Sequence, residues 1–553
     1  MQFYQKNTEN VIPDVFADIL CSALKPEATI EDIEAIGSSF YRNLAKSLYY
    51  GNYATDYRIQ TYKPYPHPDV FAAQNKTNPF SLLDNPTGIS AWVDDELIIF
   101  VDDLKGEKIS LQIINFEDGY GGTHYPLSSG VNKIKTTNRG LAYIMYHTAN
   151  PAAESVKIHI ATGTVNGYFD KTKNTKEEWL TILNNAEEKH IDIIGEHAHL
   201  VFPVRSLKNY CTDGMRLIQI YDSIVKLEHE FIGLYKYDRI SPNRMFFHVV
   251  YTDAHMYATS YLTAYAEGTL KGILNPAVLR TDEVWGPAHE VGHCNQTRPG
   301  FKWVGMTEVT NNVYSLWVQS SFGNQTRISS EILTGYNNRY EKAFTTLVAK
   351  GLAHGAHDDV FCKLVPLWQL QLYYANVIGT EKSKDFYKDL HEKVRTNANP
   401  ANNGRAQLDF VKYCCDLAQE DLTDFFKAWG FLTPINLEID DYGKQMLTIT
   451  QSQIDEVISY ASQYSKPAHD LTYIHDDCID VYKNNAAIVK GTVSINGSNI
   501  ELTGWQNVVA YEVYDESNIL QFVSPKAKFT TATAITNPVI YAIAANGTNV
   551  KAD

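Results

Sequence analysis

Two histidines and a glutamate stand at a spacing that can bind a metal ion. His289 and His293 enclose Glu290 in the sequence His-Glu-Val-Gly-His. In an α-helix, residues four apart lie on one face, so both imidazoles could reach one zinc ion at about 2.0–2.1 Å. Glu290 lies beside them and could take a proton from a water molecule at the metal. The pattern therefore predicts a hydrolytic zinc site.

The surrounding residues predict two consecutive helices that position these side chains. Pro287 is tolerated in the first turn of a helix, so we expect a helix from about 286 to 296, which Arg298-Pro299-Gly300 would end. From Trp303 onward, apolar residues recur at steps of three and four, and Glu308 lies off that apolar stripe. Two antiparallel helices with a short connection would return Glu308 to the histidines as a third ligand, which leaves the fourth position open for water.

Asn312 lies one helical turn beyond Glu308 on the same face. It could hold the outer nitrogen of a ligand histidine, and we predict this supporting role for it. The alternative is a chance match on an ordinary surface helix. The helix start, the helix-breaking residues and the following glutamate favour the zinc site. A metzincin is excluded, because its motif would need glycine in place of Gln296 and histidine in place of Pro299.

The arrangement resembles a known family of zinc peptidases. Glu308 follows the second histidine by fifteen positions, inside Gly-Met-Thr-Glu-Val-Thr-Asn-Asn-Val-Tyr-Ser, and this combination is similar to the M60, or enhancin-like, peptidases. Segments 161–170, 255–259 and 364–370 agree with that family, and the resemblance covers roughly residues 85 to 450. It implies a gluzincin that cleaves heavily O-glycosylated proteins such as mucins. The composition does not indicate this substrate independently.

With 553 residues, the chain is too long for one hydrophobic core. Its patterns and the resemblance predict a multidomain α+β protein, in which a gluzincin-like zinc peptidase domain with a mixed sheet and a mostly helical second half is flanked by β-sandwich domains. We expect a helical segment and linker over residues 1–85, a β-sandwich over 86–164, the peptidase domain over 165–462 and a second β-sandwich over 463–553.

Residues for substrate contact and for oxyanion stabilisation are less clearly indicated. Tyr257, Tyr261 and Tyr265 lie in a strand-like stretch before the metal motif. A substrate peptide could add to such a sheet edge, although a buried aromatic strand explains these tyrosines equally well. Four further residues could stabilise an oxyanion by their type alone: His354, His357, Tyr373 and Tyr374. For each of them a structural role is favoured. Substrate-binding residues therefore stay unassigned.

The formal net charge of −16 argues against nucleic acid or an anionic membrane as a partner. No apolar run is long enough to predict a membrane span, and the first residues contain no apolar signal segment. Seven sparse, irregularly spaced cysteines predict no disulfide framework. Because the resemblance implies secretion, we expect an extracellular or bacterial cell-surface protein whose export signal is not in this sequence. The oligomeric state is not indicated.

The resulting hypothesis is a zinc-dependent endopeptidase with one Zn²⁺ per chain, held by His289, His293 and Glu308, and with Glu290 as general base. Its expected partner is an O-glycosylated or mucin-like protein. One alternative is a mucin- or carbohydrate-binding surface protein with a non-catalytic metal site, because the β-sandwiches and the 36 tyrosines also suit carbohydrate binding. A zinc aminopeptidase is a second alternative.

Overall fold

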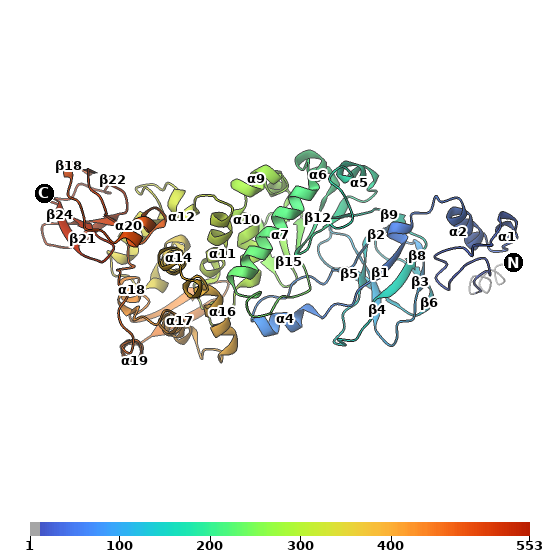
Figure 1. Cartoon of the computed structure of the whole chain (residues 1–553), viewed down its shortest axis with the longest axis horizontal. Helices are drawn as coiled ribbons and strands as arrows, with labels where there is room; N and C mark the ends of the chain where they lie inside the picture. The colour runs from blue at the N-terminus through green and yellow to red at the C-terminus, as the bar shows by residue number, and fades with distance from the viewer. Residues whose placement is uncertain (1–10, 553) are drawn as a thin grey trace. The chain divides into compact units, whose positions relative to one another are not determined.

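The computed structural model describes residues 11–552 (Figure 1). It contains two compact units, each built from several chain segments. The first unit comprises the described residues up to Ala72, Pro79–Val225 and Ser241–Glu283. The second comprises Ala73–Asn78, Lys226–Ile240 and the described residues from Val284 onward.

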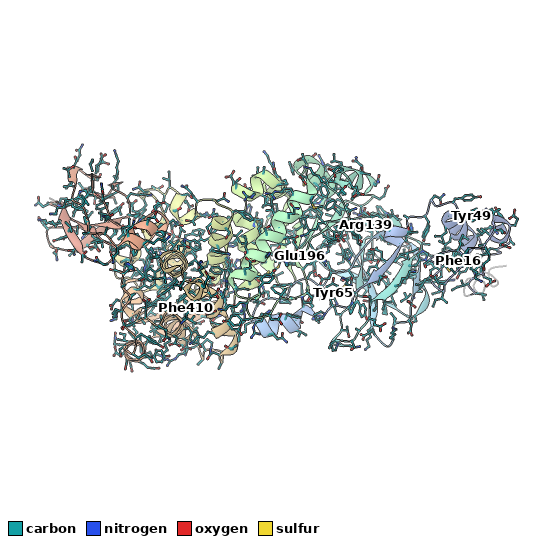
Figure 2. All side chains as sticks on the ribbon, in the orientation of Figure 1. Phe16, Tyr49, Tyr65, Arg139, Glu196 and Phe410 are labelled. Carbon is teal, nitrogen blue, oxygen red and sulfur yellow. The ribbon has the colours of Figure 1, made fainter. Side chains whose placement is uncertain are left out.

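The first unit begins with two short helices, α1 (Ile30–Glu34) and α2 (Ser39–Tyr49). A capping box between Thr29 and Asp32 satisfies backbone N–H groups at the start of α1. Phe16, labelled in Figure 2, packs with the buried side chains of both helices, whereas Tyr49 at the end of α2 is exposed. Two short helices thus lie within the range where a helical segment was expected.

Two antiparallel sheets follow and share one apolar core. The first sheet has the order β1 (Ile59–Tyr62), β8 (Val156–Ile160), β3 (Glu96–Val101) and β6 (Gly130–Lys135). The second has the order β5 (Gly122–Leu127), β4 (Ile109–Ile114), β7 (Gly140–Met145), β2 (Pro86–Ala91) and β9 (Thr164–Val165). Ile99, Leu111 and Ile158 are fully buried and fill the space between the sheets.

The stretch 56–85, interpreted from sequence as a linker, is more ordered than that. It contains α3 (Thr55–Arg58), β1 and α4 (Pro68–Asn75). Strand β1 pairs with β8 along its full length, and Tyr62 is buried in the shared core. The many turn-forming residues of this stretch suggested a linker. The strand forms because it pairs with a partner about 100 residues away in the sequence, which local patterns do not reveal.

A six-stranded mixed sheet completes the first unit. Its order is β10 (Phe169–Asp170), β11 (His190–Ile194), β12 (Ala198–Pro203), β13 (Met245–Val250), β15 (Leu262–Ala266) and β14 (Met256–Thr259). Strand β13 pairs in parallel with both neighbours and is buried throughout, as expected for a central strand. Strand β14 is an edge and exposes Tyr257, but Tyr265 on β15 is fully buried. A surface role for Tyr265 is therefore excluded.

The second unit is mostly helical and surrounds one large core. Its main helices are α10 (Trp285–Asn295), α11 (Thr307–Ser321), α14 (Val360–Gln371), α16 (Phe386–Thr396), α17 (Asn403–Ala418) and α18 (Thr423–Ala428). Phe410, labelled in Figure 2, is buried among Trp303, Phe426 and Phe431. The hairpin β16 (Ile435–Asp440) and β17 (Lys444–Ile449) follows, and then helix α19 (Gln451–Ala461). This core supports the helices that carry the metal motif.

Seven strands at the end of the chain form two small sheets with a shared core. One sheet contains β18 (Thr492–Asn496), β19 (Asn499–Thr503) and β22 (Lys528–Thr530), and the other β21 (Leu520–Ser524), β20 (Ala510–Tyr514), β23 (Val539–Ile543) and β24 (Asn549–Ala552). Leu502, Val513 and Phe529 lie between the sheets. Val523 instead belongs to the large helical core, so this part braces the helices.

The predicted mixture of sheets and helices is confirmed. The four sequence ranges predicted as domains remain predictions. All seven cysteines are buried free thiols. Among residues 11–552, no helix has both the length and the apolar character that crossing a membrane requires.

Candidate metal centre

Helices α10 and α11 present the predicted metal ligands. His289 and His293 are one turn apart on α10, which begins one residue earlier than the sequence indicated. Glu308 is the second residue of α11, and its backbone (φ −92°, ψ 17°) departs from helical values. Active-site residues recur in this region of φ/ψ space. The structure therefore brings the three residues together, as the antiparallel helix pair requires.

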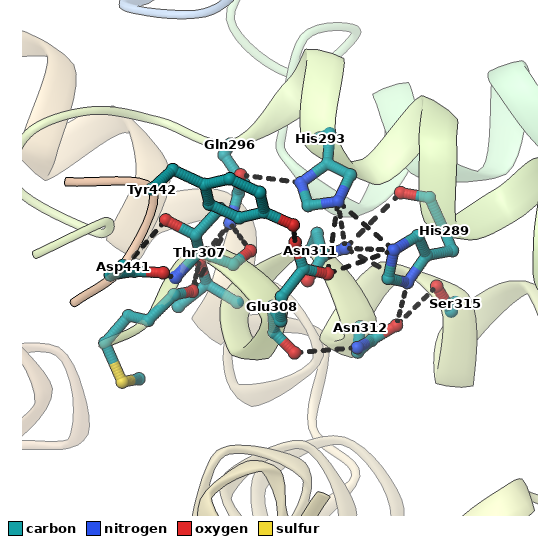
Figure 3. A network of polar contacts seen from close by, with 12 residues as sticks. His289, His293, Gln296, Thr307, Glu308, Asn311, Asn312, Ser315, Asp441 and Tyr442 are labelled. Carbon is teal, nitrogen blue, oxygen red and sulfur yellow. Dashed lines mark hydrogen bonds and ion pairs between the residues drawn. The ribbon is translucent and has the colours of Figure 1, made fainter. Parts of the chain in front are cut away.

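The three candidate ligand atoms form a nearly equilateral triangle (Figure 3). The Nε2 atoms of His289 and His293 are 3.1 Å apart. The Oε2 atom of Glu308 lies 3.2 Å from Nε2 of His289 and 3.3 Å from Nε2 of His293. Tetrahedral ligands about 2.0–2.1 Å from zinc are separated by about 3.3 Å. The donor set and its spacing therefore fit a zinc ion, and no other such group occurs among residues 11–552.

Side-chain amides contact both histidines at the ring nitrogen that faces away from the triangle. The Nδ1 atom of His289 is 2.8 Å from Oδ1 of Asn312, and Nδ1 of His293 is 3.2 Å from Oε1 of Gln296. An amide oxygen only accepts hydrogen bonds, so each Nδ1 carries the proton. Each Nε2 then directs its lone pair at the triangle, which is the tautomer that a metal ligand needs.

The close approach of the two helices depends on Gly292 in the motif. A Cβ atom at this position would lie 2.6 Å from the carbonyl oxygen of Asn311 on α11. Any larger residue would therefore push α11 away and move Glu308 from the histidines. The Asn311 side chain lies next to the histidines, with its Nδ2 atom 3.1 Å from Nε2 of His293.

Glu290 is almost completely buried beside the triangle. It is 4% exposed, and its Oε2 has no hydrogen-bond partner among the described residues. Burial raises the pKa of the Glu290 carboxyl, and the neighbouring His289 and His293 only partly oppose this. A carboxylate whose pKa is shifted toward neutrality is suited to accept and later release a proton.

Glu308 is held at its other oxygen by Tyr442. Burial acts to raise the pKa of Glu308, but the neighbouring His289, His293 and Tyr442 outweigh it and hold that pKa well below its usual range. The carboxylate is therefore ionised and ready to bind a cation. The hydroxyl of Tyr442 donates to Oε1 at 2.7 Å, and this bond raises the pKa of Tyr442 to about 12.

Tyr442 reaches Glu308 because the turn between β16 and β17 is anchored next to α11. Asp441 accepts hydrogen bonds at Oδ2 from the Thr307 hydroxyl and the Gly305 N–H, both at 2.8 Å. The Gly305 carbonyl in turn accepts a bond from the buried ammonium group of Lys363. The hairpin turn and the start of α11 are thus fixed to each other.

Comparison with known proteins finds a family that matches part of the chain. Residues 163–430 match peptidase M60, enhancin and enhancin-like. This region, just under half of the chain, is therefore similar to the M60 peptidases. Three further comparisons agree with this similarity at the level of the fold.

A metallopeptidase from Bacteroides thetaiotaomicron superposes with a TM-score of 0.80 at 28% identity, covering 97% of each chain. A metallopeptidase in complex with Tn antigen gives 0.75 at 28% identity, covering 91% of this chain and 100% of the other. The M60 catalytic domain of ZmpC from Clostridium perfringens, in complex with the sialyl T antigen, gives 0.69 at 19% identity, which shows a shared fold alone.

Vertebrate proteins are also similar to part of the chain. TRPM8 channel-associated factor 3 from Rattus norvegicus is 26% identical over 309 residues, which are 56% of this chain. TRPM8 channel-associated factor 2 from Homo sapiens is 24% identical over 275 residues. The matches span about a third of the length of these curated relatives.

The four residues considered for oxyanion stabilisation have structural partners instead. His354 is fully buried, stacks on Phe431 and has its pKa lowered to about 3 by burial. The remaining contacts are those of His357 with Thr346, Tyr373 with His469 and Tyr374 with Glu420. Only His357 lines the pocket of about 600 Å³ that also contains Glu308 and Tyr442.

Three residues of this candidate metal centre were not predicted from sequence: Gln296, Asn311 and Tyr442. Gln296 could have been found, because it caps the end of the same helix three residues after His293. Tyr442 is 134 positions from Glu308, in a turn without a motif, so no local signal indicated it.

Replacing Tyr442 with phenylalanine should weaken zinc binding about tenfold, because the Glu308 carboxylate would lose the hydrogen bond that orients it. A competition titration with a zinc chelator measures this. Tyr460→Phe is the matched control, since Tyr460 also donates to a carboxylate, that of Asp416, in another part of the same unit. Equal zinc affinity in Tyr442→Phe and the unmodified protein would contradict the orienting role.

A buried acid lies behind the metal helix. Glu228, near the end of α7 (Gly214–Phe231), is fully buried and accepts a bond at 2.9 Å from Asn295, the last residue of α10. Its Oε1 has no partner in the described structure. Burial raises the pKa of Glu228 well above 4.5, and the bond from Asn295 opposes this only in part. The folded protein therefore favours neutral Glu228.

Glu228→Gln should stabilise the protein at alkaline pH. In the unfolded chain Glu228 loses its proton above about pH 4.5, whereas in the folded protein it does so only at higher pH. Between these two pKa values the free energy of unfolding falls as pH rises, by up to ~1.4 kcal/mol per pH unit. Glutamine stays neutral and removes this loss. Urea unfolding at pH 5 and pH 8 should show a larger gain for the variant at pH 8. If the variant and the unmodified protein differ in free energy of unfolding by the same amount at both pH values, the prediction is wrong. The control is Glu230→Gln, which makes the same change at a partly exposed glutamate on the same helix.

Proposed function

We propose that this chain is a zinc-dependent endopeptidase that hydrolyses peptide bonds in O-glycosylated, mucin-like proteins. The observation that carries the proposal is the triangle of His289, His293 and Glu308, with the unpartnered Glu290 carboxylate beside it. The similarity of residues 163–430 to a peptidase family supports it.

The chain's own residues would share the chemistry as follows. His289, His293 and Glu308 would hold zinc, which when bound acts as a Lewis acid on the scissile carbonyl and lowers the pKa of water. Glu290 would accept a proton at Oε2 from the attacking water and then donate it to the leaving amine. Asn312 and Gln296 keep both imidazoles in the required tautomer throughout.

The substrate class is inferred from a relative. The metallopeptidase solved in complex with Tn antigen is 28% identical and covers 91% of this chain. A shared fold at that identity supports a glycosylated substrate here as well. Because such substrates lie outside cells, we place the protein in the extracellular space or on a bacterial cell surface.

The test is digestion of an intact mucin and the same mucin after enzymatic deglycosylation, each with and without a chelator. We expect fragments only from the intact mucin without chelator. Equal cleavage of both forms would overturn the substrate class but leave the peptidase assignment standing. Mass spectrometry of the product termini would distinguish internal cleavage from the stepwise release of an aminopeptidase.

The same assay separates the peptidase from a glycan-binding protein with a non-catalytic metal site. That alternative predicts mucin binding that survives chelation and yields no new fragments. The burial and raised pKa of Glu290 favour the peptidase, because a metal site with a purely structural role has no need of a free carboxylate beside it.

A further inference from the structure

A second pocket lies in the helical unit away from the metal ligands. It has a volume of about 660 Å³, which is in the range of small-molecule sites. Trp317 lines it and stands nine positions after Glu308 on α11, about 13 Å further along an ideal helix. None of the predicted ligands and neither Glu290 nor Tyr442 lines this pocket. It is therefore distinct from the metal centre.

One wall of the pocket is aromatic. The ring of Phe231 stacks on Tyr387 with centroids 4.8 Å apart and lies 5.5 Å from the ring of Trp317. The indole N–H of Trp317 is used in a bond to the Leu227 carbonyl, which fixes the ring in place. Tyr235 is 40% exposed and lines the same pocket. Phe231 and Tyr387 are themselves almost fully buried, so the apolar area that a ligand can reach comes from Trp317 and Tyr235. Aromatic rings present such area at little cost in conformational entropy.

A side-chain amide without a hydrogen-bond partner also lines the pocket. Gln371 is 4% exposed, yet its side chain makes no hydrogen bond within the described part of the chain. An amide that faces a pocket can both donate and accept hydrogen bonds, so this side chain is suited to a ligand with donor and acceptor groups. The π-helix η4 (Leu372–Ile378) begins at the next residue and contributes Ala375 and Asn376. π-Helical segments often occur at functional sites.

The charges around the pocket are paired. Lys236 contacts Asp385 and Asp389, and Lys388 contacts Asp385. Lys384 is paired with Glu381. These three lysines therefore carry no free charge for an anion, and an uncharged ligand fits better than a charged one.

We propose that this pocket binds a neutral sugar unit, a hexose or an N-acetylhexosamine. The apolar face of the ring would lie on the aromatic wall, and Gln371 would bond to a hydroxyl or acetamido group. Sugar binding itself does not depend on the metal chemistry. Its use in retaining a multiply glycosylated substrate rests on the proposed function, since a second contact raises the effective concentration of the substrate at the metal centre.

The experiment uses the full chain carrying Glu290→Gln, so hydrolysis does not enter the readout. Galactose, N-acetylgalactosamine and the anionic N-acetylneuraminic acid are titrated separately and followed by ligand-observed NMR. We expect millimolar binding of a neutral sugar. Adding Gln371→Leu or Tyr235→Ala should each raise the Kd about fivefold, because one removes the hydrogen bond and the other an aromatic face. Tyr49→Ala, at an exposed tyrosine in the other unit, should leave the Kd unchanged.

Three results would overturn the proposal: no binding of either neutral sugar, an unchanged Kd in the pocket variants, or tighter binding of N-acetylneuraminic acid. Thermal unfolding establishes that each variant is folded. If Gln371→Leu does not fold, Tyr235→Ala decides the question, because that side chain is partly exposed. If the unmodified protein does not cleave mucin but the expected sugar binding is observed, the result counts against the proposed function and not against this site.

Discussion

Replacing Glu290 with glutamine should lower kcat/KM for a glycosylated peptide by about 10³-fold, while zinc stays bound. Glutamine keeps the shape of the side chain but cannot accept a proton, and general-base catalysis contributes about 10²–10⁴-fold. The two histidines and Glu308 are unchanged, so the triangle that fits zinc persists. Activity is measured at saturating zinc, and the metal content by atomic emission.

Glu283→Gln is the matched control for this experiment. It makes the same chemical change at an exposed glutamate just before α10 and should retain full activity. An active Glu290→Gln variant would show that another group takes the proton. A variant that is inactive but has also lost zinc would show that Glu290 acts through the structure of the site, and the mechanism would then need a different base.

The parts of the site that sequence could predict are those set by local geometry. His289, Glu290 and His293 are placed by one helix, and Asn312 follows Glu308 by one turn. The helical repeat therefore determines which of these residues share a face. Glu308 required one more assumption, that the second helix returns antiparallel to the first, and the structure brings it to 3.2 Å from His289.

The parts that sequence did not predict depend on long-range pairing. Tyr442 reaches Glu308 only because Asp441 anchors the hairpin turn to the start of α11. Strand β1 was interpreted as linker because its order comes from pairing with β8. In both cases the deciding contact joins segments more than 90 residues apart. No periodicity in a short window reports such a contact.

Replacing Glu308 with alanine should have the largest effect on metal binding. It removes one of three protein ligands, so the loss of zinc affinity should exceed the ~10–100-fold that is typical when a supporting partner of a ligand is removed. The Asp441 contacts at the start of α11 and the amides behind the histidines are unaffected. The remaining histidine pair should therefore keep its geometry but bind zinc weakly.

This loss has a thermodynamic signature that does not depend on activity. Zinc that binds only the folded protein raises its stability by RT ln(1 + [Zn]/Kd), about 2.7 kcal/mol at one hundred times Kd. We therefore expect zinc to raise the Tm of the unmodified protein but not that of Glu308→Ala at the same concentration. Glu438→Ala removes an equal charge from the pocket beside Glu308 and should retain the zinc-dependent shift. A retained shift in Glu308→Ala would mean that zinc binds elsewhere, since two imidazoles alone cannot supply that stabilisation.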